Sequence, residues 1–153
     1  MTKAHCKIVE LREDGIDIAV ALLSRFFAEE GFPGTRETIV LNTRSLWADS
    51  YHWIALAWVG GVAVGVVTVT TMLYVEWGRL GEIGDLYVIP EARNSGIGAA
   101  LIEGAKAKCR TMGCSAISVV ITREGEERHG LTRFYQRFGF AGSGRSILTH
   151  VLT

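Results

Sequence analysis

The 153 residues suit one folded domain, residues 1–153, with a substantial core. Sixteen basic and sixteen acidic side chains cancel, so no overall field draws the chain to nucleic acid or to an anionic membrane. A hydrophobic content of 48% with 21% charged residues excludes a disordered chain.

The first part of the chain predicts a short strand and two helices. The strand runs from Ile8 to Leu11. Asp14 is expected to cap the first helix, which carries apolar residues at helical spacing and ends where Gly and Pro follow, at Gly31–Gly34. Thr35 is expected to cap a second helix, Thr38–Trp47.

The stretch from Trp53 to Val75 holds no Asp, Glu, Lys, Arg or His and is long enough to span a bilayer. Gly60-Gly61 in its middle is a two-residue hairpin signal, and β-branched residues dominate from Val62 to Thr71. Because central strands are near-continuous apolar runs, two buried strands explain this stretch better than a membrane helix.

The remaining elements alternate between strand and helix patterns. In order they are strands at Trp53–Val59, Val62–Leu73 and Leu80–Val88, a helix at Ala99–Met112, a strand at Ser115–Ile121, a helix at Leu131–Phe138 and a last strand at Arg145–Leu152. Gly113 is expected to end the longer helix. The resulting order, β-α-α-β-β-β-α-β-α-β, predicts an α/β fold of mixed sheet and helices.

Cysteine usage and the first residues indicate a cytoplasmic protein. Cys6, Cys109 and Cys114 form an odd number without metal-ligand spacing, so we expect reduced thiols. No Cys-x-x-Cys or His-Glu-x-x-His occurs, and no metal is expected. Residues 1–7 lack the apolar core of a signal peptide.

The most informative segment is Arg93-Asn94-Ser95-Gly96-Ile97-Gly98-Ala99, between a strand pattern and a helix pattern. Its glycines let the backbone pass close to a ligand, and the helix start adds partial positive charge, which suits phosphate or pyrophosphate. Leu101 stands where a dinucleotide motif needs its third glycine. The Gly-Lys-Ser/Thr of triphosphate-binding loops does not occur in the sequence.

What remains, Arg-x-x-Gly-x-Gly-Ala after Asp-Leu-Tyr-Val, resembles the acetyl-CoA-binding motif of the GNAT superfamily of N-acetyltransferases. An ordinary helix start with flexible glycines is the simpler interpretation of this segment alone. Downstream, Arg133-Phe134-Tyr135-Gln136-Arg137-Phe138-Gly139-Phe140 resembles the Phe-Tyr-x-x-x-Gly-Phe block of the same superfamily. The resemblance implies an acetyl-CoA-dependent enzyme that acts by direct attack in a ternary complex. It also implies a mixed, mostly antiparallel central sheet flanked by helices.

The resemblance assigns positions to the chemistry. Tyr135 matches the tyrosine that many members use as general acid toward the CoA sulfur, although a packing tyrosine is the structural alternative. Glu82 falls where some members carry a glutamate general base, and a solvated surface charge is its alternative. Asp85 competes with Glu82, because a β-bulge would redirect the side chains by one position. Many members use a water chain in place of a dedicated base.

The resemblance also implies how acetyl-CoA binds. Leu86, Tyr87 and Val88 would hydrogen-bond the pantetheine arm as an added strand, with a backbone N–H near Leu86 stabilising the oxyanion. The pyrophosphate would lie on the amides of Arg93–Ala99, with the Arg93 guanidinium adding charge. One position departs from the family, since a common cofactor-contacting asparagine falls on Arg128.

Family members bind the acceptor near the first two helices. Here Phe27 and Phe32 with Glu29 and Glu30 suit a cationic amine through cation–π contact and charge pairing, although a solvated structural segment is the simpler interpretation. An aminoglycoside is the first expectation and a polyamine-like amine the second. A protein or peptide acceptor and a non-catalytic CoA-binding module remain alternatives. Dimers are common in the family, so a homodimer is one expectation.

Overall fold

The computed structural model describes residues 5–153, which form two compact units, one that ends at Val120 and one that comprises Ile121–Thr153. The first unit holds the sheet and its covering helices. Its elements are β1 (Cys6–Glu10), the 3₁₀ helix η1 (Glu13–Gly15), α1 (Ile16–Glu30), α2 (Arg36–Ala48), β2 (Trp53–Val59), β3 (Val62–Tyr74), β4 (Gly78–Val88), the 3₁₀ helix η2 (Pro90–Ala92), α3 (Ile97–Thr111) and β5 (Cys114–Val119).

The five strands lie in the order β1-β2-β3-β4-β5. Every neighbouring pair is antiparallel except β4–β5, which is parallel. A parallel pair needs a crossover connection, and α3 supplies it. The predicted mixed, mostly antiparallel α/β fold is therefore confirmed.

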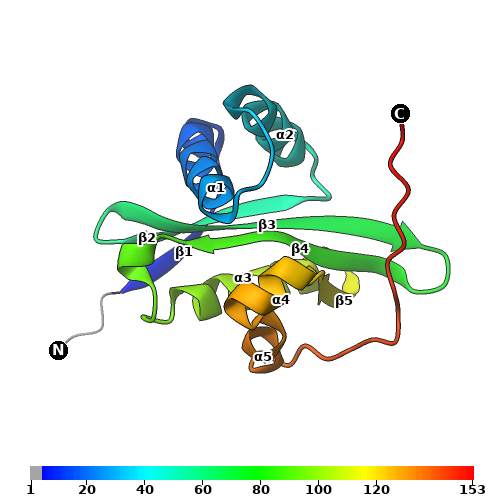
Figure 1. The fold of residues 1–153 in the computed structure, drawn as a ribbon. Coiled ribbons are helices and arrows are strands. Elements are labelled where there is room, and N and C mark those ends of the chain that lie inside the picture. The colour runs from blue at the N-terminus through cyan, green and yellow to red at the C-terminus, as the bar shows by residue number, and fades with distance from the viewer. Residues whose placement is uncertain (1–4) are drawn as a thin grey trace. The chain divides into compact units, whose positions relative to one another are not determined.

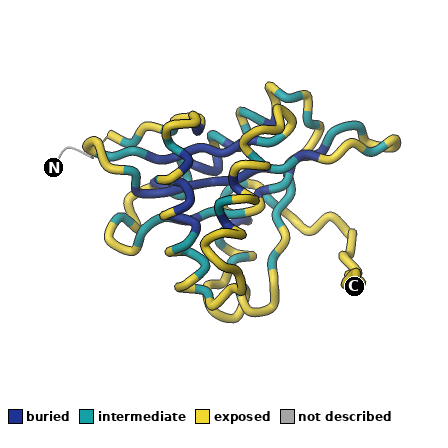
Figure 2. Tube along the Cα trace, turned by 90° about the horizontal axis from the view of Figure 1, so that it is seen from above, coloured by how far each residue is buried: buried dark blue, intermediate teal, exposed yellow. Residues whose placement is uncertain are grey.

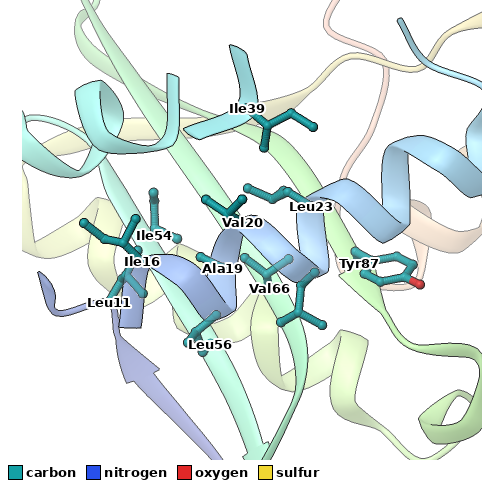
Figure 3. Close-up of a cluster of buried hydrophobic side chains, with 11 residues drawn as sticks. Leu11, Ile16, Ala19, Val20, Leu23, Ile39, Ile54, Leu56, Val66 and Tyr87 are labelled. Carbon is teal, nitrogen blue, oxygen red and sulfur yellow. The ribbon is translucent and has the colours of Figure 1, made fainter. Parts of the chain in front are cut away.

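Helices cover both faces of the sheet, with α1 and α2 on one face and α3 on the other (Figure 1). One buried cluster fills the α1 face, where Val20 and Leu23 of α1 meet Leu56 and Val66 of the sheet (Figure 3). The cluster comprises Leu11, Ile16, Ala19, Val20, Leu22, Leu23, Ile39, Ile54, Leu56, Val66 and Tyr87. Burial of this apolar surface is the main driving force for folding of the unit.

On the opposite face, α3 approaches the sheet at glycines. A side chain at Gly65 of β3 would meet Leu101, and one at Gly81 of β4 would meet the sulfur of Cys109. Gly104 of the helix faces β1 in the same way. The α3 face therefore depends on small residues for its close packing.

The helix ends follow the predicted caps in part. The Thr35 hydroxyl caps α2 by accepting a hydrogen bond from the Thr38 N–H at 3.1 Å, as predicted. The prediction for Asp14 is wrong, because η1 occupies that position and α1 begins at Ile16 without a side-chain cap. Gly113 follows α3 with a φ of 79°, the left-handed conformation that suits a helix end.

The uncharged stretch from Trp53 to Val75 contains β2 and β3. They are joined at Gly60 and Gly61, which have φ values of 56° and 79°. The hairpin prediction is therefore confirmed, and buried positions run through the centre of the sheet (Figure 2). Within residues 5–153, no helix is long and apolar enough to cross a membrane.

The second unit contains two short helices, α4 (Arg123–His129) and α5 (Leu131–Gln136). The helix predicted at Leu131–Phe138 corresponds to α5, which ends two residues earlier, whereas α4 has no counterpart among the predicted elements. Thr122 caps α4 by accepting a hydrogen bond from the Gly125 N–H at 3.0 Å. This cap is a local signal from which α4 could have been predicted.

The predicted last strand, Arg145–Leu152, is wrong, because residues 141–153 have no helix or strand. The side chains of Ile147 and Leu148 are 66% and 96% exposed. Apolar residues supply strand propensity, but a strand also needs backbone partners. Residues 121–153 contain no other strand that could provide them within this unit.

Candidate active site

A β-bulge in β4 lies at the centre of the candidate site. Thr68 of β3 lies opposite Asp85. The next residue of β3, Val69, lies opposite Ile83, which leaves Gly84 as the extra residue. Since side chains alternate between the faces of a strand, one extra residue resets that alternation. The bulge on which the prediction for Asp85 depends is therefore present.

The bulge brings both candidate bases to one face of the sheet. Asp85 lies opposite Thr68, and Glu82 lies opposite Thr70. These two threonines share a face because they are two residues apart. Thr68 also lies opposite Ile54, a member of the cluster beneath α1. Glu82 and Asp85 therefore both belong to the α1–α2 face of β4.

Asp85 is held by Thr68, which is not among the predicted site residues. The Thr68 hydroxyl donates to Asp85 Oδ2 at 2.6 Å, and Thr68 is buried. Burial raises the pKa of Asp85, and the hydrogen bond from Thr68 opposes part of that rise. A carboxylate with a raised pKa is a better proton acceptor than an ordinary one. The available signal was a set of polar positions, Thr68, Thr70 and Thr71, in an apolar run.

The end of β4 extends beyond its parallel neighbour. Within the described part of this unit, β4 pairs with β5 only over Arg79–Ile83, and the rest of β4 pairs with β3 alone. This part of β4 contains Leu86, Tyr87 and Val88, which are predicted to bind the pantetheine arm. An open strand edge of this kind can pair with an extended ligand.

The predicted phosphate-binding residues form the junction between β4 and α3. Asn94 and Gly96 have φ values of 61° and 84°, so the chain turns tightly before α3 begins at Ile97. The Ala100 N–H donates to the Gly96 carbonyl at 3.1 Å as the first bond of the helix. The amides before Ala100 therefore have no acceptor within the helix. Together with the helix dipole, they suit an anion such as a pyrophosphate.

Arg93 lies between the end of β4 and α1. Its Nε donates to the Val88 carbonyl at 2.9 Å, and its Nη2 donates to Glu29 Oε2 at 2.9 Å. Glu29 Oε1 accepts a hydrogen bond from the Tyr87 hydroxyl at 2.6 Å. Glu29, which is predicted to bind the acceptor, thus contacts two residues that are predicted to bind acetyl-CoA.

These contacts shift the pKa of both Glu29 and Tyr87. The hydrogen bond from Tyr87, aided by that from Arg93, holds the pKa of Glu29 below its usual value. Burial, together with the bond to Glu29, raises the pKa of Tyr87 to about 12. At neutral pH the carboxylate is therefore ionised and the phenol protonated, which is the pairing that the hydrogen bond requires.

Aromatic side chains gather near the C-terminal end of α1. The rings of Phe26 and Tyr87 stack with centres 5.3 Å apart. Phe26 also contacts the rings of Phe27 and Phe32, each at 5.6 Å. Phe32 remains 45% exposed, and Glu30 nearby in sequence is half-buried. The structure brings the two predicted acceptor aromatics, Phe27 and Phe32, into one cluster with Tyr87.

In the second unit, Tyr135 lies on α5 among aromatic side chains. Its ring meets those of Phe134 and Phe140 edge to face, with centres 5.1 Å and 5.4 Å apart. Gly139, with a φ of 88°, turns the chain so that the Phe140 N–H reaches the Tyr135 carbonyl at 3.3 Å. Burial raises the pKa of Tyr135 to about 12, so its phenol is protonated at neutral pH. The packing role is observed, and the role as general acid stays a prediction.

Within residues 5–153, no group of three or more His, Cys, Asp or Glu side chains could hold a metal ion. The cysteines are free thiols. Burial, with a contribution from Cys114, raises the pKa of Cys109 to about 12, so its thiol is protonated at neutral pH.

Comparison with known proteins gives one family match. The sequence model described as acetyltransferase (GNAT) family matches residues 19–140 of this chain. No curated protein sequence matches the chain.

Solved structures share the fold over nearly the whole chain. An integron cassette protein from the mobile metagenome of Cole Harbour Salt Marsh is 28% identical, with a TM-score of 0.82 over 95% of this chain and 90% of its own. A protein described as a possible acetyltransferase from Clostridium difficile 630 is 17% identical, with a TM-score of 0.85 over 97% and 98%. The aminoglycoside N-acetyltransferase AAC(6')-Iy, in complex with the bisubstrate analogue CoA-S-monomethyl-acetylneamine, is 17% identical, with a TM-score of 0.83 over 98% and 100%.

Proposed function

The chain belongs to the acetyltransferase (GNAT) family, and from that premise we propose that it transfers an acetyl group from acetyl-CoA to a primary amine of a small cationic acceptor. An aminoglycoside is the first candidate acceptor and a polyamine-like amine the second. As a family member the chain is an acyl-CoA-dependent N-acetyltransferase. The observation that carries the proposal for the acceptor is the face of β4 that Glu82 and Asp85 share.

Asp85 is the stronger candidate for the general base. Thr68 engages Asp85 Oδ2 and leaves Oδ1 to accept the proton of an ammonium group. The raised pKa of Asp85 increases its basicity. Glu82, on the same face, adds a negative charge that attracts a cationic amine.

The remaining groups suit the donor side. Acetyl-CoA supplies the reactive thioester when it is bound. Arg93 and the amides at the start of α3 bind its pyrophosphate, and the backbone from Leu86 to Val88 binds its extended arm. A backbone N–H near Leu86 stabilises the negative charge that develops on oxygen. By its resemblance to the family's tyrosine, Tyr135 is the candidate proton donor for the departing sulfur, and its hydroxyl is protonated at neutral pH.

An aminoglycoside fits a surface that combines carboxylates with aromatic rings. Its several ammonium groups pair with carboxylates such as Asp85 and Glu82, and they bind aromatic faces such as those of Phe27 and Phe32. The likeness to AAC(6')-Iy supports this class of acceptor. At 17% identity that likeness concerns the fold, so the proposal depends mainly on the charges of the β4 face.

The experiment that tests the proposal is an acceptor panel. Purified protein is incubated with acetyl-CoA and with aminoglycosides, polyamines, amino acids and peptides, and the products are read by mass spectrometry. Mass detection avoids interference from the thiols of Cys6, Cys109 and Cys114. We expect one added acetyl group on an aminoglycoside. Acetylation of peptides alone would contradict the small-molecule proposal, and CoA binding without any product would contradict catalysis.

Variants then separate the roles of the two carboxylates. Asp85→Asn should lower kcat by about 100-fold or more, because it removes the general base. Glu82→Gln is the matched control, and it should mainly raise the KM for the cationic acceptor. A large loss of kcat in Glu82→Gln with little change in Asp85→Asn would reverse the assignment. Tyr135→Phe should lower kcat without changing the affinity for CoA.

A further inference from the structure

Two ion pairs join the end of α1 to the segment that follows β4. Glu29 pairs with Arg93 at 2.9 Å, and Arg25, one turn earlier, pairs with Glu91 at 2.8 Å. Glu91 lies in η2, two residues before Arg93. The segment that is expected to bind the pyrophosphate is therefore linked to the helix that is expected to bind the acceptor.

Arg93 presents its donors in a fixed arrangement. The Val88 carbonyl accepts from Nε at 2.9 Å, which orients the guanidinium at the end of β4. Its Nη2 is taken by Glu29 Oε2. Carboxylates and phosphates are alternative partners for a guanidinium, because both accept charge-assisted hydrogen bonds from it. Glu29 thus occupies a donor that a phosphate would also use.

The position of Glu29 does not depend on Arg93 alone. Its Oε1 accepts from the Tyr87 hydroxyl at 2.6 Å, and Tyr87 is buried against the ring of Phe26. A carboxylate held at one oxygen by a buried phenol can keep its place when the other oxygen loses its partner. The side chain of Arg93 is 45% exposed, so a ligand can reach its guanidinium from solvent.

We propose that Glu29 is an internal anion that competes with the pyrophosphate of acetyl-CoA for Arg93. When phosphate takes Arg93, Glu29 Oε2 loses that one partner on the acceptor side, and a cationic amine can take its place. Donor and acceptor binding are then coupled through one carboxylate, and by linkage the coupling is reciprocal. The inference rests on the proposed function, because it requires CoA to bind at Arg93.

Calorimetric titration with CoA tests the competition without turnover. In Glu29→Gln the amide oxygen still accepts from Tyr87, but the charge opposite Arg93 is gone. CoA should bind about two- to fivefold more tightly than to the wild type, as expected when a partly exposed ion pair no longer competes. Glu10→Gln is the matched control, because it removes an equal charge on β1 that is paired with Lys108. Its affinity for CoA should match that of the wild type.

Each other outcome overturns the inference. Equal or weaker CoA binding by Glu29→Gln would show that Glu29 does not compete, and equal tightening in Glu10→Gln would indicate a general charge effect. If Glu29→Gln fails to fold, carbon NMR of the wild type decides. Saturation with CoA should raise the pKa of Glu29, because its bond to Arg93 is lost, and an unchanged pKa contradicts competition. A wild type that binds no CoA would overturn the proposed function itself and this inference with it.

Discussion

The two faces of β4 differ in what they can accommodate. Toward α3 the strand presents Gly81, which lies against Cys109, and the buried side chain of Ile83. Toward α1 and α2 it presents the carboxylates Glu82 and Asp85. In a regular strand, residues 82 and 85 would face opposite ways because side chains alternate. Close packing on one face thus sets the position of the strand, while one extra residue decides which face receives the second carboxylate.

The largest expected effect on stability is at Gly65, on the face of the sheet that packs against α3. A Cβ there would lie 2.9 Å from the Tyr87 carbonyl oxygen and 3.0 Å from Leu101 Cδ1. Because a backbone oxygen in the sheet cannot move aside, Gly65→Ala should lower the free energy of unfolding by about 3 kcal/mol or more, measured by urea denaturation. Gly142→Ala is the control, since its Cβ meets nothing within 4 Å. A loss at Gly65 no larger than at Gly142 would show that this face has room.

The second prediction concerns Gly81, whose neighbour can be removed. A Cβ there would lie 2.4 Å from Cys109 Sγ but 3.6 Å from Cys109 Cβ. Gly81→Ala alone should therefore cost about 1–3 kcal/mol of unfolding free energy. In a Cys109→Ala background the same change should cost less than about 1 kcal/mol, because the obstructing atom is gone. Additive losses in this double-mutant cycle would contradict the contact.

Local signals predicted those elements whose partners are close in sequence. Gly60-Gly61 identified the β2–β3 hairpin, and Thr35 identified the start of α2. The strand expected at Arg145–Leu152 does not form, because its apolar pattern says nothing about backbone partners. The cap at Thr122 was readable from sequence but lay in a charged segment without apolar periodicity, so α4 was missed.

The site was predictable only where a motif marks it. The Arg93–Ala99 segment follows from its glycines and its place before a helix. The bond between Thr68 and Asp85 does not, because it depends on the register of β3 against β4. The pairing of Arg93 with Glu29 spans 64 residues and follows from tertiary packing alone. The sequence therefore predicts the candidate donor segment, whereas the contacts that surround this segment are seen only in the structure.

The third prediction concerns Asp85 on the α1–α2 face of β4 and the pH dependence of the unfolding free energy. Burial raises the pKa of Asp85 in the folded state above its unfolded value. Its contribution to stability is then fully present below the unfolded pKa, about 3.9, and is lost as pH rises through the folded pKa. The unfolding free energy of the wild type should therefore fall relative to Asp85→Asn over a pH window that begins at about pH 4, near the unfolded pKa, and ends above the raised folded pKa. A difference that stays constant over this window would contradict a half-buried carboxyl whose charged form is destabilised.

The smallest expected effect is at the bulge. Gly84 lacks a positive φ, so its backbone does not require glycine. Its Cβ would meet only Thr68 Oγ1, at 3.0 Å, and a hydroxyl can shift by a few tenths of an ångström. Gly84→Ala should therefore cost less than about 1 kcal/mol of unfolding free energy.

The same variant also tests the hydrogen bond between Thr68 and Asp85, which lies beside the bulge. Displacing the Thr68 hydroxyl should weaken its bond to Asp85 and raise the pKa of that carboxyl, which carbon NMR can follow. Thr68→Val should raise that pKa in the same direction, because it removes the donor altogether. If Gly84→Ala instead unfolds the protein, the bulge depends on glycine itself. The placement of Asp85 would then require Gly84. The register that packing against α3 gives to β4 would not be sufficient to produce that placement.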